Sequence, residues 1–324
     1  MLPNLKRLSN REYGNTTVDG DATSHRFFVD GKLLESDAYL NGAWTNVVLG
    51  STGAGGKSVF ALKFDAANPR SVTGSNLMWE INATTASGLN YKDRLGHVTG
   101  TMAMGRMKNG DWAGIFGNGM DSTDGGAYLW IVNLRTGQPI VAPIQAGTDK
   151  SANGLHGIGL IRDSSRNVIG AYAGDAKGKL WRFDLESASA SDWKTGLSNQ
   201  PLFDAGTAKP ITAAPTFILH PKGGLMVLFG TGRLYTTADE STTDTQSLYG
   251  VWDLTIPGQP SDGKPGANST QIVQHQVSST PVSGTKYTAY TIVPSATKLI
   301  YTNGSGTRGW RVDQTVTPGE RDIY

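Results

Sequence analysis

The sequence predicts an all-β protein with the architecture of a β-propeller. Three observations support this prediction: 42 glycines among 324 residues with only 17% charged residues, a strand pattern that recurs along the chain, and almost no helical periodicity. High glycine content with low charge favours short strands joined by tight turns over long surface helices. The length allows one large β domain, and no shift in composition divides the chain. We therefore expect a single propeller domain over residues 1–324.

The recurring unit is an aromatic-rich alternating strand that follows a glycine turn and ends in Asp or Asn before Leu. Its copies, aligned on that ending, are about 50 to 70 residues apart, which suits blades of four short strands around a central axis. A second element, an apolar strand that ends in glycine, precedes several copies. The copies of the first element are residues 58–64, 128–134, 179–185, 248–254 and, in part, 310–313; those of the second are residues 47–50, 114–119, 171–175 and 227–232.

Composition excludes several classes of protein. With 29 basic and 27 acidic residues, the chain offers no electrostatic case for nucleic acid. The absence of cysteine excludes disulfides, thiolate zinc sites and cysteine nucleophiles. No stretch reaches the roughly 18–20 apolar residues of a membrane span, and the first residues lack the apolar core of a signal peptide. The chain is therefore either cytosolic or a mature fragment of a longer protein, and its abrupt end soon after residues 309–313 favours the fragment.

Two glycine-rich segments are similar to nucleotide-binding motifs. Residues 51–58 differ from a P-loop at the first position, where Ser51 replaces glycine, and the alternating residues that follow predict a strand instead of the required helix. Residues 304–309 have the spacing of a dinucleotide-binding loop but also lead into a strand. We interpret both segments as turns between strands.

Catalytic motifs are equally sparse. There is no Gly-x-Ser-x-Gly elbow, and no pair of histidines has His-x-x-x-His spacing, so we expect surface or core histidines. Residues 133–138 are similar to a turn of quinoprotein dehydrogenases, but Pro139 stands where a docking tryptophan should follow, and without cysteine the disulfide that often stacks on their cofactor is impossible. A quinone-cofactor oxidoreductase remains an alternative because its propeller geometry is shared. The histidines are His25, His97, His156, His220 and His275.

An ordered set of short strings resembles one family: the C-terminal β-propeller of the PilC/PilY-type factors, the tip-associated adhesin and biogenesis proteins of bacterial type IV pili. The resemblance implies a quinoprotein-like, modified propeller of about seven blades, and leaves open whether this chain holds all of them. The residues that carry it are 37–44, 49–50, 53–57, 95–96, 109–112, 116–119, 122–125, 172–175, 178–185, 229–233 and 246–253. Most of them have a structural interpretation: glycines form turns, Trp and Tyr fill the space between blades, and Asp184 and Asp253 end strands and cap the following turns.

Some members of this family bind calcium in a propeller loop of the pattern Asp-x-Asp/Asn-x-Asp-x-x-x-Asp. The equivalent stretch is residues 162–171, where the candidate ligands that remain are Asp163, Ser165 and Asn167. Calcium prefers six to eight oxygens, several of them carboxylate. Only one carboxylate is left, and Arg166 adds a positive charge. We therefore expect no tight calcium site, and an ordinary turn between Asp163 and Asn167.

Two further acidic loops contain more oxygen ligands. They are Asp121 with Asp124, and Asp239 and Glu240 with Asp244. Either could hold an ion, although solvated turn residues are the default expectation. We predict no other cofactor.

The resemblance implies a non-enzymatic, exported protein at the cell surface or pilus tip, associated with the outer membrane or periplasmic in transit. Such a protein supports pilus assembly by countering retraction, and through the pili it supports surface attachment and twitching motility. Its implied partners are minor pilins and a host-cell or abiotic surface. The loops at residues 239–246 and 261–269 are the first places to look for contacts. An alternative is a carbohydrate-binding propeller that uses exposed tryptophans such as Trp44, Trp112 or Trp193.

Overall fold

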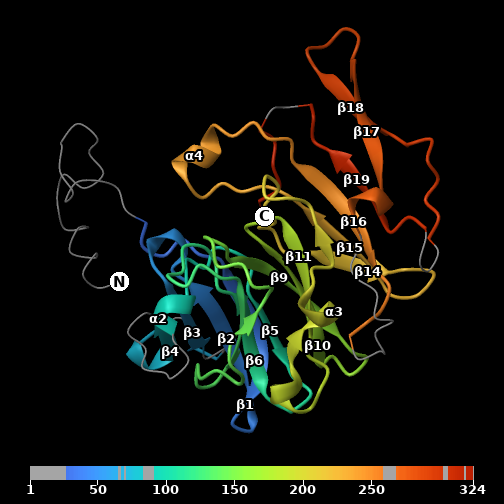
Figure 1. Ribbon diagram of the computed structural model, residues 1–324. Coiled ribbons are helices and arrows are strands. Elements are labelled where there is room, and N and C mark those ends of the chain that lie inside the picture. Colours follow the sequence, from blue (N-terminus) through green and yellow to red (C-terminus); the bar gives the residue numbers. More distant parts are fainter. Residues whose placement is uncertain are drawn as a thin grey trace, which may run out of the picture.

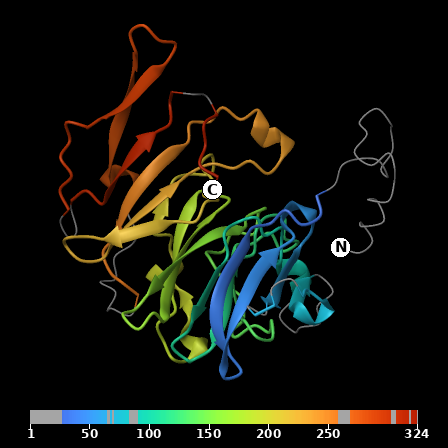
Figure 2. The same ribbon diagram turned by 180° about the vertical axis from the view of Figure 1, so that it is seen from behind.

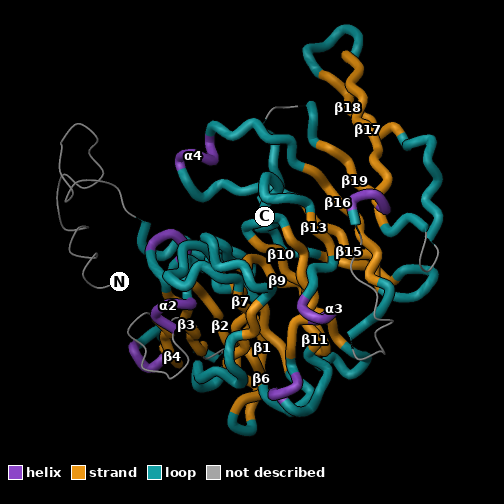
Figure 3. Tube along the Cα trace, viewed as in Figure 1, coloured by secondary structure: helices purple, strands orange, loops and turns teal. Residues whose placement is uncertain are grey.

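The computed structural model of the chain describes residues 27–64, 67–68, 71–82, 91–257, 268–301, 306–316 and 319–323. Within these ranges the strands form four sheets, which follow one another in chain order from the blue N-terminal sheet to the orange and red C-terminal sheet (Figure 1). Figure 2 shows the same succession from behind. We call these sheets blades one to four. Figure 3 shows how strongly strands and loops dominate over short helices.

Each of the first three blades is an antiparallel meander of consecutive strands. Blade one contains β1 (Leu33–Leu40), β2 (Ala43–Ser51), β3 (Ser58–Phe64) and β4 (Leu77–Asn82), and blade two contains β5 (Ala103–Arg106), β6 (Trp112–Gly117), β7 (Tyr128–Asn133) and β8 (Ile144–Gln145). Blade three contains β9 (Leu155–Arg162), β10 (Val168–Asp175), β11 (Lys179–Asp184) and β12 (Lys194–Thr195), with β13 (Phe203–Asp204) also paired to β11.

Blade four is larger. Its strand order is β14-β15-β16-β19-β17-β18, with β17 parallel to β19. The β17–β18 hairpin projects away from the other blades in both views (Figures 1 and 2). The bounds are β14 (Thr216–Leu219), β15 (Leu225–Gly230), β16 (Ser247–Asp253), β17 (Ile272–Pro281), β18 (Thr288–Val293) and β19 (Gly309–Asp313), and the short helices of the chain are α2 (Tyr91–Arg94), α3 (Gly196–Asn199) and α4 (Thr237–Glu240).

The predicted repeat matches the blades. Its aromatic strands are β3, β7, β11 and β16, the third strand of each blade, and the glycine-ended strands that precede them are β2, β6, β10 and β15, the second strand of each blade. The fifth, partial copy was wrongly assigned to the repeat, because β19 is hydrogen-bonded to β16 within blade four. The described residues thus form four blades. The prediction of a single domain over residues 1–324 stays a prediction.

Alternating side chains of each blade pack against the blades on either side. In β7, Trp130 lies in the core shared with blade one, whereas Ile131 lies in the core shared with blade three. In β11, Trp181 faces blade two and Leu180 faces blade four. This period-two division explains why a strand between two blades is buried on both faces. Truncating a fully buried residue such as Trp130 to alanine would cost about 3–5 kcal/mol.

Blade four differs from blade three in register. Ala173 pairs with Trp181 in blade three, and Phe229 pairs with Tyr249 in blade four. Tyr249 therefore occupies the place of Trp181, and Asp253 follows one residue later than Asp184 does. Since a one-residue shift turns a side chain to the other face of a strand, Asp253 points back toward blade three. This corrects the alignment on the Asp–Leu ending and the interpretation of Asp253 as only a turn cap.

The segment that is similar to a P-loop forms a turn between strands. Residues Gly53–Gly55 make a single 3-10 turn between β2 and β3, and β3 begins at Ser58, where a P-loop would start a helix. The second glycine-rich segment lies partly outside the described residues, and its end leads into β19. The interpretation of the first segment as a turn is confirmed, and the second segment leads into a strand as predicted. In the described part of the chain, no helix combines the length and apolarity needed to cross a membrane.

Candidate functional site

The loop between β9 and β10 contains the candidate calcium ligands. Asp163 Oδ1 accepts hydrogen bonds from the backbone amides of Ser165 and Asn167, each at 2.9 Å, and Asn167 Nδ2 donates to Asp163 Oδ2 at 3.3 Å. These hydrogen bonds outweigh desolvation and lower the pKa of Asp163. Arg166 has a left-handed backbone with φ of 65°. The carboxylate of Asp163 therefore organises a tight turn with Asn167, as expected.

The two other acidic loops differ from each other. Asp121 and Asp124 pair with separate lysines: Lys57 lies 3.1 Å from Asp121, and Lys150 lies 2.8 Å from Asp124. Within the described residues, no group of three or more histidine, aspartate or glutamate side chains is placed to hold a metal ion. The chemistry of this loop is that of surface ion pairs, each worth about 0–1 kcal/mol.

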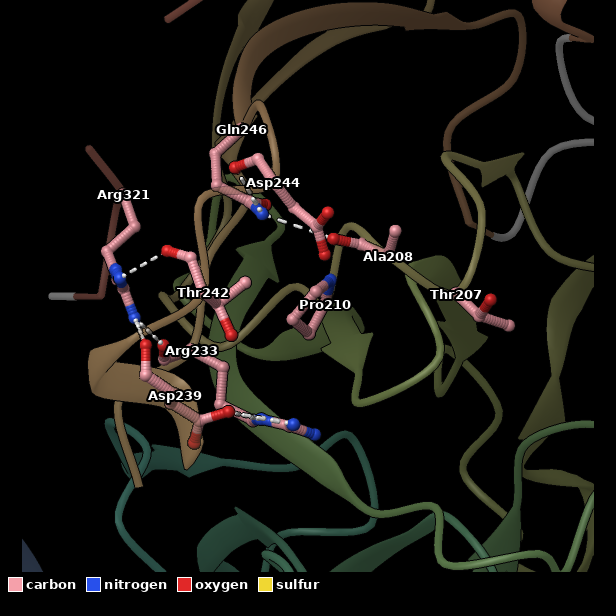
Figure 4. Close-up of a pocket in the computed structure, with 9 residues that line it drawn as sticks. All are labelled: Thr207, Ala208, Pro210, Arg233, Asp239, Thr242, Asp244, Gln246 and Arg321. Carbon is pink, nitrogen blue, oxygen red and sulfur yellow. Dashed lines mark hydrogen bonds and ion pairs between the residues drawn. The ribbon is translucent and has the colours of Figure 1, made fainter. Parts of the chain in front are cut away.

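The loop around α4 forms a more elaborate cluster. Asp239 Oδ1 accepts from Arg233 Nε at 2.9 Å, and its Oδ2 accepts from the backbone amides of Tyr235 and Thr236 at 2.9 and 2.8 Å. These hydrogen bonds outweigh the effect of burial and lower the pKa of Asp239 to about 2. Asp239 therefore stays ionised and holds α4 against Arg233 (Figure 4).

Arg321 completes this cluster from the C-terminal end of the chain. Its guanidinium donates to the backbone carbonyls of Arg233 and Thr242 at 2.9 and 3.1 Å and also to that of Asp239. We call Arg233, Asp239, Thr242 and Arg321 the open cluster. Because Arg321 binds carbonyl oxygens of both ends of the loop, it ties the loop to a segment about 80 residues away in sequence.

The open cluster borders a polar pocket of about 100 Å³. Gln246 lines it and donates to the Ala208 carbonyl at 3.1 Å, while its Oε1 is buried without a hydrogen-bond partner among the described residues. Arg233 keeps 41% of its side chain exposed. A pocket of this size with arginine, carboxylate and amide groups can accept one polar side chain of a partner. Its lining residues are Thr207, Ala208, Pro210, Arg233, Asp239, Thr242, Asp244, Gln246 and Arg321 (Figure 4).

The predicted contact loop at residues 239–246 thus lines a pocket. Of the second predicted loop, residues 261–269, all but 268 and 269 lie outside the described residues. The sequence did not point to Arg321, because no motif links it to the loop that it binds. The unpaired amide oxygen of Gln246 is likewise visible only once the fold is known.

A second arginine–aspartate cluster lies between blades three and four. Arg182 Nη1 lies 3.1 Å from each carboxylate oxygen of Asp253, and Arg182 Nε lies 2.9 Å from Asp184. The Tyr172 hydroxyl donates to Asp253 at 2.8 Å, and Thr255 Oγ1 accepts from Arg182 at 2.8 Å. We call these five residues the closed cluster. Burial alone would lower the pKa of Arg182, but the carboxylates of Asp253 and Asp184 raise it.

The histidines have separate structural environments. The ring of His220 stacks on Trp252 with centroids 4.3 Å apart, and His275 Nδ1 accepts from the Ser295 amide at 3.0 Å. His97 Nδ1 lies 2.9 Å from the Gly53 carbonyl oxygen. His156 is buried against Tyr235, and its burial, together with the charge of Arg233, lowers its pKa to about 4. His25 lies outside the described residues.

The turn that is similar to quinoprotein dehydrogenases lies between β7 and β8 of blade two and contacts blade one. Gly137 has φ of 72°, and a Cβ there would lie 2.7 Å from the indole ring of Trp79. Trp79 Nε1 donates to the Leu134 carbonyl at 2.8 Å. A tryptophan therefore does pack on this turn, but it comes from β4 of the preceding blade. This contact holds two blades together and carries no catalytic group.

The three tryptophans named for carbohydrate binding differ in exposure. Trp44 is 67% exposed, and Trp112 is partly buried beside it. Trp193 was wrongly grouped with them, because it is only 4% exposed and its indole N–H donates to the Ser187 carbonyl at 2.9 Å. Only the first two remain candidates for stacking on a ligand.

Comparison with known proteins identifies relatives over most of the chain. The model of the PilY1 beta-propeller domain matches residues 3–287. The chain is 37% identical over 294 residues to a type IV pilus biogenesis factor PilY1 homolog of Xylella fastidiosa, which covers 85% of this chain and 18% of that protein. It is 34% identical over 318 residues to the type IV pilus biogenesis factor PilY1 of Pseudomonas aeruginosa, which covers 90% of this chain and 26% of that protein. The chain therefore spans only about a quarter or less of the length of these relatives.

A solved structure supports the same relationship. The crystal structure of the Pseudomonas aeruginosa PilY1 C-terminal domain superimposes with a TM-score of 0.77 at 31% identity, over 92% of this chain and 65% of that chain. Family match, relatives and three-dimensional similarity agree with the blade repeat and confirm the resemblance inferred from the sequence strings. The chain belongs to the PilY1 β-propeller domain family.

Proposed function

We propose that the protein containing this chain is a non-enzymatic type IV pilus biogenesis factor that supports pilus assembly by countering retraction. The observation that carries the proposal is its identity of 34–37% to proteins named type IV pilus biogenesis factors. Through the assembled pili, the protein also supports surface attachment and twitching motility. This role requires export to the cell surface or pilus tip, with minor pilins as the nearest partners.

The open cluster suggests how the propeller takes part. Its loop is held rigid by Asp239 and Arg321, so the pocket beside it exists before a partner binds. Preorganised loops on a rigid scaffold are the usual carriers of recognition. We propose that this pocket receives a polar side chain of a minor pilin, with Arg233 and Asp244 as the groups that meet it.

The test of the general function is genetic. Deletion of the gene should reduce the number of surface pili in a strain with the retraction motor. Removing the motor as well should restore the number of pili in the deletion strain. An unchanged number of pili in both backgrounds would contradict the proposal.

The test of the pocket uses single variants in the same two backgrounds. Arg233→Ala should lower pilus number, because it removes the exposed cation of the pocket, whereas Arg135→Ala removes a comparable exposed arginine at a blade-two turn and should leave it unchanged. The amount of each variant protein at the cell surface should be equal. Equal pilus numbers for both variants would show that the pocket does not contact the pilus.

A further inference from the structure

Three hairpins from three successive blades border one hollow of about 650 Å³. They are the β1–β2 hairpin of blade one, the β5–β6 hairpin of blade two and the β9–β10 hairpin of blade three. The β1–β2 hairpin marks this end of the molecule at the bottom of Figures 1 and 2. The volume lies within the range of roughly 300–1,000 Å³ that is typical of small-molecule sites. The hollow is remote in sequence from the loop of the open cluster.

An aromatic platform forms one side of the hollow. Trp44 contacts Tyr39 and Trp112 edge-to-face, with ring centroids 5.6 and 5.9 Å apart and interplanar angles of 68° and 78°. These contacts hold Trp44 in place although 67% of its surface is exposed. An indole ring that is held in one orientation and yet exposed to solvent is typical of a binding surface.

Arginines form the other side. Arg106, Arg162 and Arg166 all line the hollow, and within the described part of the chain none of them forms an ion pair. Arg162 is held by a hydrogen bond of 2.7 Å from its Nη2 to the Met104 carbonyl. Burial and the nearby charge of Arg166 lower the pKa of Arg162. The hollow therefore concentrates positive charge that an anion would neutralise.

We propose that this hollow binds an acidic oligosaccharide, with Trp44 stacking on a sugar ring and Arg166 and Arg162 binding its carboxylate. Asp37 also lines the hollow and supplies an acceptor for sugar hydroxyls. A site with an aromatic face, bidentate cations and a carboxylate acceptor matches a ring that carries both hydroxyls and an acid. An acidic peptide fits less well, because a chain of acidic residues brings neither a sugar ring for Trp44 to stack on nor ring hydroxyls for Asp37 to accept.

This ligand deepens the attachment part of the proposed function and rests on it. The β9–β10 turn, which is similar to a calcium loop but keeps only one carboxylate, places Arg166 at the hollow. The proposal therefore assigns this turn to anion binding instead of calcium binding. The test measures binding by the purified chain, so it can fail while pilus assembly succeeds, and the reverse.

The experiment titrates the chain with three carboxylated probes, a galacturonic acid trimer, a hyaluronan tetrasaccharide and sialyllactose, and with lactose as the neutral control. Tryptophan fluorescence and calorimetry report binding. At least one carboxylated probe should bind and lactose should not. Trp44→Ala should weaken that binding by at least about tenfold. Arg166→Gln should weaken it by about five- to tenfold and reduce its dependence on salt.

Matched variants exclude indirect effects. Tyr287→Ala removes an aromatic ring with the same 67% exposure as Trp44 from a different blade, and it should leave binding unchanged. Arg135→Gln is the matched control for charge. Failure of all three carboxylated probes, or equal binding of lactose, overturns the proposal. Binding of a glutamate decapeptide in preference to every saccharide also overturns it, in favour of an acidic peptide.

Discussion

The closed and open clusters place the same pair of residue types in opposite surroundings. In the closed cluster, Arg182 and Asp253 each expose only 2% of their side chains, and both lie between packed blades. In the open cluster, Asp239 is as well hydrogen-bonded as Asp253, but its partner Arg233 is 41% exposed. Both side chains of the Arg182–Asp253 pair are shielded from solvent, whereas in the Arg233–Asp239 pair the arginine remains hydrated.

The difference teaches where each cluster can act. Removing one member of a buried pair leaves an uncompensated charge, so the closed cluster fixes how blade four docks on blade three. An exposed arginine keeps its hydration and can exchange water for a partner at little cost. The open cluster is therefore available for binding, and the closed cluster is not.

The largest expected effect comes from the closed cluster. Arg182→Met should lower the free energy of unfolding by about 3–5 kcal/mol, because it leaves the Asp253 carboxylate buried without its cation. The equivalent place in β7 is occupied by buried Ile131, so an apolar side chain is compatible with this position of a blade. Urea denaturation followed by tryptophan fluorescence measures the change.

Arg233→Met is the matched variant in the open cluster, and it should cost no more than about 1 kcal/mol. Adding Asp253→Asn to Arg182→Met should recover part of the loss, since it removes the unpaired charge. Equal costs for the two arginine variants would contradict the distinction between closed and open clusters.

The second prediction concerns His156, which lies beneath the open cluster. Its pKa is lowered from 6.5 to about 4 by burial, with a smaller contribution from Arg233. Between these values the unfolded chain binds a proton that the folded chain does not, so stability falls as pH falls through this window. The loss attributable to His156 should reach about 3 kcal/mol at pH 4 and vanish above about pH 7.

The comparison variant is His156→Phe, which keeps an aromatic ring beside Tyr235 and cannot be protonated. Its stability should depend less on pH between 6.5 and 4 than that of the unmodified chain, as measured by urea denaturation at each pH. The carboxylate of Asp239, with its pKa near 2, loses its stabilising contribution only between about pH 4 and pH 2. Identical pH profiles for the two proteins would show that His156 is not buried in its neutral form.

Sequence reasoning found the parts of this fold that are encoded locally. The second and third strands of each blade could be predicted because alternating aromatic residues and terminal glycines lie within ten residues of each other, as in β10 and β11. The docking of Trp79 on Gly137 could not be predicted, because the two residues belong to different blades. The register shift of Asp253 could not be predicted either. The pairing of the strands, and not the string Asp–Leu, decides which face of a strand a residue occupies.

The candidate sites depend even more on contacts between distant segments. The loop at residues 239–246 could be named from its acidic and polar composition, but its partner Arg321 lies beyond four further strands, β16 to β19. The hollow at Trp44 brings together three hairpins whose tips are each about 60 residues apart. A tryptophan and an arginine at such separations carry no joint signal in a single sequence.

The smallest expected effect concerns Asp163, which is only partly buried, whereas Asp239 and Asp253 are buried. Its Oδ1 already accepts two backbone amides, and Arg166 stands within the loop, so calcium gains only one carboxylate and meets a cation. Because a ligand stabilises a fold only in proportion to its affinity for the folded state, calcium should raise the melting temperature by less than about 1 °C. Scanning calorimetry with micromolar calcium and with chelator measures the shift, and Asp163→Ala is the control. A rise of several degrees that Asp163→Ala abolishes would show that calcium binds to this loop. The carboxylates of the closed and open clusters would then differ from Asp163 in acting without a metal ion.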